Sequence, residues 1–251
     1  MNKSFTDSFD CLPLIIAGPC SVESELQIEN TAKELSKLGI KFLRGGAFKP
    51  RTSPESFQGL GSKGVELISR AAKNNNMFVV TELMDSPQLK KHYDDIDIIQ
   101  IGSRNMSSFS FLKEVGKMTA EVQKPVLLKR GFSATITEFL HAAQYIIQEG
   151  NQNVVLCLRG IRTFEQIDSL FRFTPDLASI IELKERSNLK VIYDPSHASG
   201  NAKYIEKISL AAISLGADGL MIESHYRPEE AQSDKDQCIL PVEVGRILSQ
   251  I

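Results

Sequence analysis

The chain has 251 residues, of which 42% are hydrophobic and 24% charged, as in an ordinary globular protein. Its formal net charge of −2 provides no general positive field for nucleic acid, so any anion-binding site must be local. There is no apolar run of membrane-spanning length and no secretory signal, and the 4 cysteines are scattered without a C-x-x-C pair. We therefore expect a cytoplasmic protein that binds neither nucleic acid nor membranes.

Short apolar runs typical of strands alternate along the chain with longer amphipathic runs typical of helices. The strand-like runs are continuously apolar, as expected of parallel strands covered on both faces. Helical patterns such as Thr137–Glu149, with apolar residues at three- and four-residue spacing, lie between them. The strand-like runs cover Leu14–Pro19, Lys41–Gly46, Met77–Leu83, Asp97–Ser103, Pro125–Gly131, Val154–Gly160, Lys190–His197 and Gly219–His225.

This alternation of strands and helices over about 250 residues predicts a single closed (β/α)8 TIM barrel. An open doubly wound sheet remains an alternative at this point. We expect one catalytic barrel over residues 1–251, with no separate regulatory domain. The first dozen residues are expected to form a short leader, or a strand that closes the bottom of the barrel.

Each predicted strand ends in a reactive or ionic residue, and in a parallel barrel these ends meet on the face where active sites are built. Arg suits forked recognition of carboxylate and phosphate, and Lys acts as a compact charge. Lys49 and Arg51 follow the second strand, so six cations near one cavity predict a ligand with several anionic groups. Ion pairs with neighbouring helices are the alternative for each cation. The strand ends are Cys20, Arg44, Glu82, Arg104, Lys129, Arg159, His197 and Glu223.

A metal site is suggested by Cys20, His197, Glu223 and a carboxylate in the segment Gln232–Gln237. These residues lack the short spacing of a zinc motif, but the first, seventh and eighth strands adjoin when a barrel closes. Thiolate, imidazole and carboxylate together suit Mn, Fe, Co or Zn better than Mg or Ca. His225, two residues beyond Glu223, is expected to be either a neighbour of the ligands or an alternative ligand.

Seven ordered segments resemble the 3-deoxy-D-arabino-heptulosonate 7-phosphate (DAHP) synthase family, in its short I-beta form. The resemblance runs to the pair Ser233 and Asp234 and so covers nearly the whole chain. It implies a barrel transferase that condenses phosphoenolpyruvate with erythrose 4-phosphate, the first step of aromatic amino-acid (shikimate) biosynthesis. The segments are AGPCSVES (17–24), RGGAFKPRTSPESFQGLG (44–61), IGSRNM (101–106), KPVLLKRG (124–131), RGIRTFE (159–165), DPSHASG (194–200) and ADGLMIESH (217–225).

Matched segment by segment, the resemblance also implies a role for individual residues. One divalent ion would be held by Cys20, His197, Glu223 and Asp234, and Lys49 would be the catalytic acid. The remaining positions would contact substrates. These are Arg44 and Lys129 at the enolpyruvate carboxylate, Arg104 and Arg159 at its phosphate, Arg51 and Thr52 at the aldose phosphate, and Asp194. Glu82 would be a further site carboxylate whose role stays open.

The chain departs from the family pattern in several places. Leu158 replaces the usual Glu before Arg159, which could alter the handling of metal or water. Phe173–Pro175 replace Asn-Thr-Leu, and Asp236 provides a second candidate carboxylate after Asp234.

Two other functions remain open on the sequence. The sister enzyme 3-deoxy-D-manno-octulosonate 8-phosphate synthase normally has an Asn-Arg-Ser-Ser loop, unlike Lys-Pro-Arg-Thr-Ser at 49–53 here. A non-catalytic paralogue is the second alternative. The resemblance implies a homodimer or homotetramer, and control by a separately encoded partner also remains open.

Overall fold

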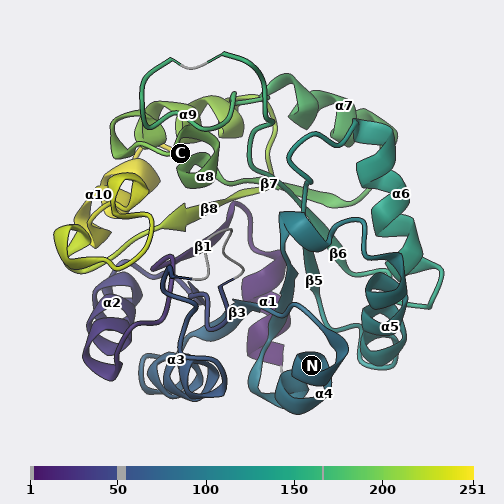
Figure 1. The fold of residues 1–251 in the computed structure, drawn as a ribbon, viewed down its shortest axis with the longest axis horizontal. Helices are drawn as coiled ribbons and strands as arrows, with labels where there is room; N and C mark the ends of the chain where they lie inside the picture. The colour runs from purple at the N-terminus through teal and green to yellow at the C-terminus, as the bar shows by residue number, and fades with distance from the viewer. Residues whose placement is uncertain (1–2, 50–54, 166) are drawn as a thin grey trace.

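The computed structural model describes residues 3–49, 55–165 and 167–251. Its strands form a closed parallel barrel in which each pairs with the next and β8 pairs with β1 (Figure 1). The predicted TIM barrel is confirmed, and the open sheet is excluded. The strands are β1 Leu14–Gly18, β2 Phe42–Arg44, β3 Phe78–Glu82, β4 Ile98–Ile101, β5 Val126–Lys129, β6 Val154–Leu158, β7 Lys190–Tyr193 and β8 Gly219–Glu223.

Helices surround the strands as a ring (Figure 1). The predicted helix Thr137–Glu149 is α6, which begins earlier because Thr135 and Glu138 form a capping box. No helix among the described residues is long and apolar enough to cross a membrane. The ring contains α2 Glu25–Lys37, α3 Ser62–Asn74, α4 Ser86–His92, α5 Phe109–Ala120, α6 Ile136–Ile147, α7 Ala178–Arg186, α9 Ala202–Ser214 and α10 Pro241–Leu248.

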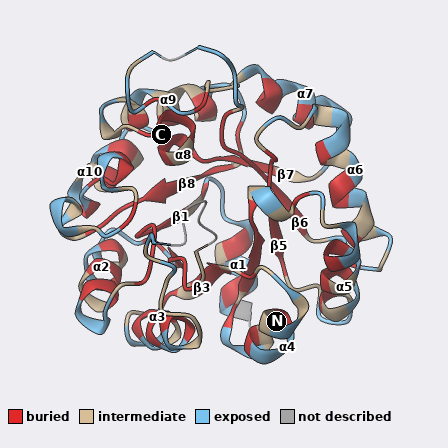
Figure 2. Ribbon diagram, in the orientation of Figure 1, coloured by how far each residue is buried: buried red, intermediate tan, exposed pale blue. Residues whose placement is uncertain are grey.

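Side chains along the strands alternate between two apolar layers. In β6, Leu156 and Leu158 pack in the layer between sheet and helices, whereas Val155 and Cys157 belong to the cluster inside the barrel. Successive strand residues point to opposite faces. The same alternation therefore directs Arg159, the next odd position, into the upper mouth of the barrel. Figure 2 shows the strands buried and the outer helix faces exposed.

The bottom of the barrel is closed by α1, Lys3–Asp10. Phe5 and Phe9 are buried, and their four-residue spacing places both rings on one face of the helix. The Phe5 ring lies 5.9 Å from that of Phe42 and 5.0 Å from that of Phe78, at strand starts. The expected strand in this segment was wrong, because aromatic residues at helical spacing form a helix that fills the opening.

Every predicted strand was longer than the observed one, and the ends of β7 and β4 show the reason at two site residues. β7 stops at Tyr193 because Asp194 caps the short helix α8, Pro195–Ser199, by accepting a hydrogen bond from the His197 amide. Proline at the first helical position favours the same turn. After β4, Arg104 lies in the 3-10 turn η2, Ser103–Asn105. The side chains of His197 and Arg104 thus reach the barrel mouth from short helical turns.

Candidate active site

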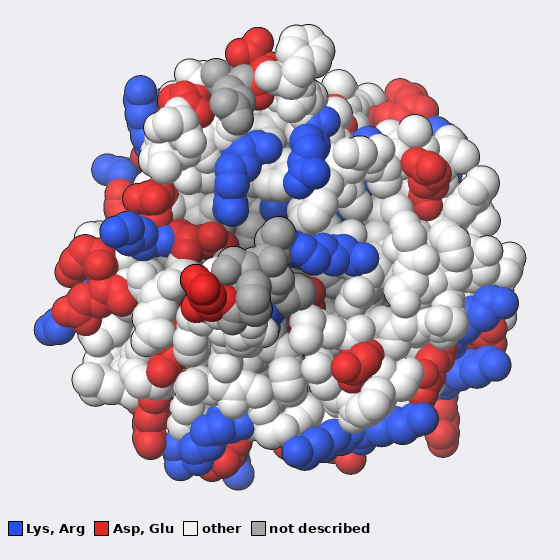
Figure 3. All heavy atoms as spheres, viewed as in Figure 1, with Lys and Arg blue, Asp and Glu red and all other residues white. Residues whose placement is uncertain are grey.

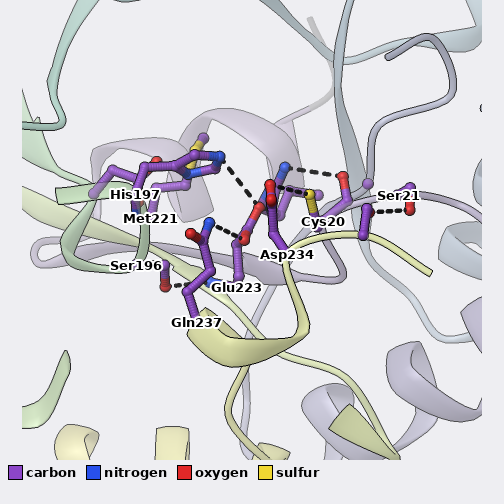
Figure 4. Close-up of polar contacts among 12 residues, drawn as sticks. Cys20, Ser21, Ser196, His197, Met221, Glu223, Asp234 and Gln237 are labelled. Atoms are coloured by element: carbon purple, nitrogen blue, oxygen red, sulfur yellow. Dashed lines mark hydrogen bonds and ion pairs between the residues drawn. The ribbon is translucent and has the colours of Figure 1, made fainter. Parts of the chain in front are cut away.

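Four side chains of the types that bind metals converge at the upper mouth of the barrel. The ligand atoms of Cys20, His197, Glu223 and Asp234 all lie within 4.8 Å of one another. Cys20 Sγ donates to Asp234 Oδ2 at 3.1 Å, and His197 Nε2 lies 3.5 Å from Glu223 Oε1 (Figure 4). They come from the end of β1, from α8, from β8 and from the loop after β8. Asp236 is exposed and outside this four-residue cluster.

The electrostatics of the cluster suit a cation. Burial and the Glu223 carboxylate raise the pKa of the Cys20 thiol to about 12. Burial opposes ionisation of Asp234, but His197 and Lys49 outweigh it and hold its pKa well below the usual range. A thiol, an imidazole and two carboxylates form a donor set for a borderline divalent ion. These residues therefore fit a single metal ion.

The backbone conformation of Asp234 determines where its carboxylate points. Asp234 has left-handed dihedral angles, φ 51° and ψ 37°, which a non-glycine residue rarely adopts. Such conformations persist where the surroundings enforce them, often at active sites. Here the strained turn directs the carboxylate toward Cys20, and η4, Lys235–Gln237, follows directly.

Asp194 orients His197. Its fully buried carboxylate contacts His197 Nδ1 at 2.7 Å and Lys129 Nζ at 2.5 Å. Burial opposes its ionisation, but His197 and Lys129 outweigh this and lower the pKa of Asp194. Since an ionised carboxylate only accepts, His197 carries its proton on Nδ1 and turns the Nε2 lone pair toward the cluster. Asp194 contacts two other site residues and is absent from the cavity lining, although a substrate contact was predicted.

Glu223 is held from two sides. Arg44 Nη1 donates to its Oε1 at 2.6 Å, and Gln237 Nε2 donates to its Oε2 at 2.6 Å. Glu223 is fully buried, which favours the protonated form of its carboxyl group. His197 and Arg44 outweigh burial and lower the pKa of Glu223. Arg44, predicted to meet substrate, is thus paired with a carboxylate of the cluster and does not line the cavity.

A cavity of about 400 Å³ opens beside the cluster, and its lining includes His197 and Asp234. Figure 3 shows blue side chains converging near the middle of this face. Glu82 also lines the cavity and accepts from Gln100 Nε2 at 3.1 Å. Arg51 and Thr52 lie outside the described residues. The cationic lining residues are Lys49, Arg104, Lys129 and Arg159, all predicted, and Arg162 and Arg172, which were not predicted.

Lys49 reaches the cluster from the loop after β2. Its Nζ lies 3.0 Å from both Cys20 Sγ and the Cys20 carbonyl oxygen. Burial works against its charge, but Cys20 and Glu223 outweigh burial, so the pKa of Lys49 is raised. Its ammonium group is therefore protonated at neutral pH and is able to donate a proton into the cavity.

Two residues that raised questions lie away from the cavity. Leu158 is buried in the sheet–helix layer, so its replacement of Glu does not face the four-residue cluster. His225 accepts at Nδ1 from the Arg227 amide at 2.9 Å, and its Nε2 faces Glu23 Oε2 at 3.9 Å. The structure thus separates His225 from the four donors.

Glu23 was missed by the sequence reasoning, although it stands in the same segment as Cys20. Its Oε1 accepts from Ser21 Oγ at 3.0 Å and from the Gln232 amide at 2.9 Å, while Ser21 Oγ lies 2.5 Å from Ser233 Oγ. These bonds tie the loop bearing Asp234 to the segment bearing Cys20. Gln237 was also missed, because only the folded loop brings it to Glu223.

The fold and site define a class: a TIM barrel whose strand ends carry a metal-type donor cluster beside a cation-lined cavity. A family comparison agrees with this class, since the model of the DAHP synthetase I family matches residues 10–251. The chain belongs to the DAHP synthetase I family, as the sequence resemblance predicted.

Individual relatives support this membership. The chain is 48% identical over 225 residues to a Thermotoga maritima protein named phospho-2-dehydro-3-deoxyheptonate aldolase, covering 90% of the chain and 64% of that relative. A crystal structure of the Thermotoga DAHP synthase superposes with a TM-score of 0.88 at 46% identity, covering 94% of this chain and 67% of that one. A truncated Thermotoga form gives a TM-score of 0.84 at 44% identity, covering 94% and 84%.

More distant relatives carry the name of the sister activity. A Francisella tularensis 2-dehydro-3-deoxyphosphooctonate aldolase is 29% identical over 253 residues, which is 94% of this chain and 88% of that relative. The difference between 48% and 29% identity places the chain nearer to the heptonate relative.

Proposed function

We propose that this chain is a DAHP synthase, which condenses phosphoenolpyruvate with erythrose 4-phosphate and releases phosphate. The single observation that supports it best is the cation-lined cavity, which shares His197 and Asp234 with the four-donor cluster. The two substrates carry two phosphates and a carboxylate, which matches the excess of positive charge. The name of the Thermotoga relative supports the same activity.

The proposed substrate contacts are divided among the two phosphates and the carboxylate. Arg104 and Arg159 bind the phosphate of phosphoenolpyruvate, and Lys129 binds its carboxylate region. Arg44, which was predicted at the same carboxylate, acts through Glu223, with which it is paired. Arg51 and Thr52 bind the aldose phosphate. Asp194 acts through Lys129 and His197, because its carboxylate is fully engaged by them.

The reaction balances with one water. Carbon 3 of phosphoenolpyruvate forms a bond to the aldehyde carbon, and the aldehyde oxygen takes a proton from Lys49, whose ammonium lies at the cavity edge. Carbon 2 becomes an oxocarbenium ion, to which water adds with loss of a proton. The hemiketal then collapses by C–O cleavage, so phosphate leaves and carbon 2 becomes a ketone. The buried cations stabilise the charge on the phosphate throughout.

Cys20, His197, Glu223 and Asp234 would hold one divalent ion, namely Mn, Fe, Co or Zn. When bound, such an ion supplies Lewis-acid polarisation of the aldehyde oxygen. Asp194 keeps the His197 imidazole in the tautomer that ligation requires.

Phosphate release with Mn²⁺ and defined aldose phosphates tests the proposal. The full chain should consume phosphoenolpyruvate much faster with erythrose 4-phosphate than with arabinose 5-phosphate. The opposite preference would assign the chain to the sister activity. No phosphate release with any aldose phosphate would favour the non-catalytic paralogue.

We propose in addition that the chain works as a homodimer or homotetramer, which light scattering of the purified protein would measure. Titration of the enzyme with phenylalanine, tyrosine, prephenate and chorismate would test direct feedback control. A lack of response to all four would leave two alternatives, an unregulated enzyme and control by a separately encoded partner.

A further inference from the structure

The Arg159 guanidinium lies against two aromatic rings. Its central carbon lies 3.8 Å from the ring centroid of Phe173 and 4.9 Å from that of Phe132. The two rings stack on each other with centroids 5.3 Å apart and an interplanar angle of 28°. All this lies at the cavity wall, since Phe132, Phe173 and Arg159 are lining residues.

Arg159 carries a buried charge, and no carboxylate among the described residues contacts it. Its Nε and Nη1 are buried, and neither has a hydrogen-bond partner among the residues the structure describes. Burial lowers the pKa of Arg159 to about 10, and the attraction of Asp194 does not compensate. Asp194 itself is already engaged by Lys129 and His197. A buried, unsatisfied cation is costly unless a ligand anion completes it.

The loop that carries Phe173 is built to hold this ring in place. Ile161 and Thr174 exchange two backbone hydrogen bonds, of 3.0 and 2.8 Å, which fold the loop after β6 back onto itself. Gly160 has φ +75°, and a Cβ there would lie 2.9 Å from the Thr174 carbonyl oxygen. The Arg162 amide donates to the Phe132 carbonyl oxygen at 2.7 Å, which ties the loops after β5 and β6 together. The contact therefore rests on fixed backbone.

Phe132 also serves two other cations. The Arg104 and Arg162 guanidinium carbons each lie 5.3 Å from its ring centroid. An aromatic ring attracts a cation through its quadrupole, but it carries no net negative charge. It can therefore hold guanidinium groups close together without neutralising them, whereas a carboxylate would compete with an incoming anion for the same N–H groups.

We propose that Phe132 and Phe173 form an aromatic clamp that positions Arg159 for an anionic group of the substrate. The clamp takes the place of the carboxylate that would ordinarily orient a buried arginine, and no group among the described residues occupies the Nε and Nη1 donors. The choice of phosphoenolpyruvate as ligand rests on the proposed function. The two rings are positioning residues, because they act through Arg159.

Binding of phosphoenolpyruvate to the full chain, measured by titration calorimetry, tests the clamp. Phe173→Leu should weaken binding about tenfold, the size expected when a desolvated cation–π contact is lost. Phe173→Tyr, which keeps the ring, should bind within about twofold of the unaltered chain. The matched control is Phe171→Leu, since Phe171 is equally buried in the same loop but packs on Tyr204. This control should also bind within about twofold.

A double-mutant cycle shows whether the effect passes through Arg159. In an Arg159→Met background, Phe173→Leu should weaken binding no further. In turnover, Phe173→Leu should raise the KM for phosphoenolpyruvate and leave that for erythrose 4-phosphate unchanged. The clamp is refuted if Phe173→Leu binds normally, if Phe171→Leu causes an equal loss, or if the two effects are additive.

The binding experiment also separates the clamp from the proposed function. If the chain binds phosphoenolpyruvate or inorganic phosphate through the clamp but does not condense it with erythrose 4-phosphate, only the proposed function fails. If condensation occurs but the Phe173→Leu variant matches the unaltered chain in Kd and KM, only the clamp fails.

Discussion

Replacing Asp194 with Asn should damage both stability and metal binding, for reasons that its contacts define. The carboxylate neutralises the Lys129 ammonium at 2.5 Å and accepts from His197 Nδ1 at 2.7 Å. Both partners are largely buried, and Asp194 is fully buried. Removing one member of a buried ion pair leaves the other uncompensated and typically costs about 3–5 kcal/mol. The free energy of unfolding of a native protein is typically about 5–15 kcal/mol, so the variant should still fold but with much lower stability.

The effect on metal binding has a separate cause. The Asn amide would donate to His197 Nδ1, so the ring proton would move to Nε2 and occupy the lone pair that faces the four-residue cluster. Loss of such an orienting partner typically weakens metal binding about 10- to 100-fold. The Asn oxygen can still cap the His197 amide, so α8 itself should persist.

Urea unfolding of the metal-free chain at pH 7 and Mn²⁺ titration measure the two effects. Since folding lowers the pKa of Asp194 below its ordinary 3.8, its contribution is fully present above that pH. It is lost as the pH falls through the folded pKa, so the difference in unfolding free energy between unaltered chain and variant should shrink in acid. Asp94→Asn, at an exposed carboxylate, is the control and should change stability by less than about 0.5 kcal/mol. An Asp194→Asn variant that is as stable as the unaltered chain and binds Mn²⁺ as tightly would refute this reasoning.

Three further sets of substitutions have defined expected outcomes, one at the metal-type donors and two in the apolar core. Cys20→Ser and His197→Ala should each lower bound Mn²⁺, measured by mass spectrometry, together with turnover; full activity in excess chelator would contradict a metal site. Leu158→Ala should cost about 2–5 kcal/mol in urea unfolding yet leave the Kd for Mn²⁺ unchanged, because Leu158 packs against helices. Phe9→Ala should lower the free energy of unfolding by about 3–5 kcal/mol, because it opens the bottom of the barrel. An unchanged unfolding midpoint would argue against α1 closing the barrel.

The barrel was predictable because its signal is periodic. Apolar runs alternated with amphipathic ones, and the period of two within each strand determines which end residues turn inward. Arg44, Lys129 and Glu223 lie in register with interior residues two positions earlier, namely Phe42, Leu127 and Met221. Their convergence follows from that spacing. Arg159 obeys the same rule one step beyond the end of β6.

Other site features depend on loops, where no period applies. His197 lies in a capped helical turn and Arg104 in a 3-10 turn. The strand pattern of the sequence had assigned both residues to strand ends. Gln237 and Arg172 reach each other at 2.9 Å across 65 positions of sequence, a contact created by the way two loops fold back. Phe173 was noticed only as a departure from a family pattern, and its role depends on the backbone pairing of Ile161 with Thr174.

The strand ends and the loops after them carry both cations and metal-type donors, and the structure shows that several of the cations contact those donors. Lys129 contacts Asp194, the carboxylate that orients His197. Lys49 contacts Cys20, Arg44 contacts Glu223, Lys129 contacts Asp194, and Arg172 lies 3.5 Å from Asp234. The charges of Arg44, Lys129 and Arg172 are thus balanced by carboxylates, whereas Lys49 contacts a thiol that its raised pKa keeps neutral. Arg104, Arg159 and Arg162 differ, since among the described residues none has a carboxylate in contact and all three gather around the ring of Phe132. The unbalanced charge of the cavity is therefore concentrated around that ring, and this is where an incoming phosphate gains most.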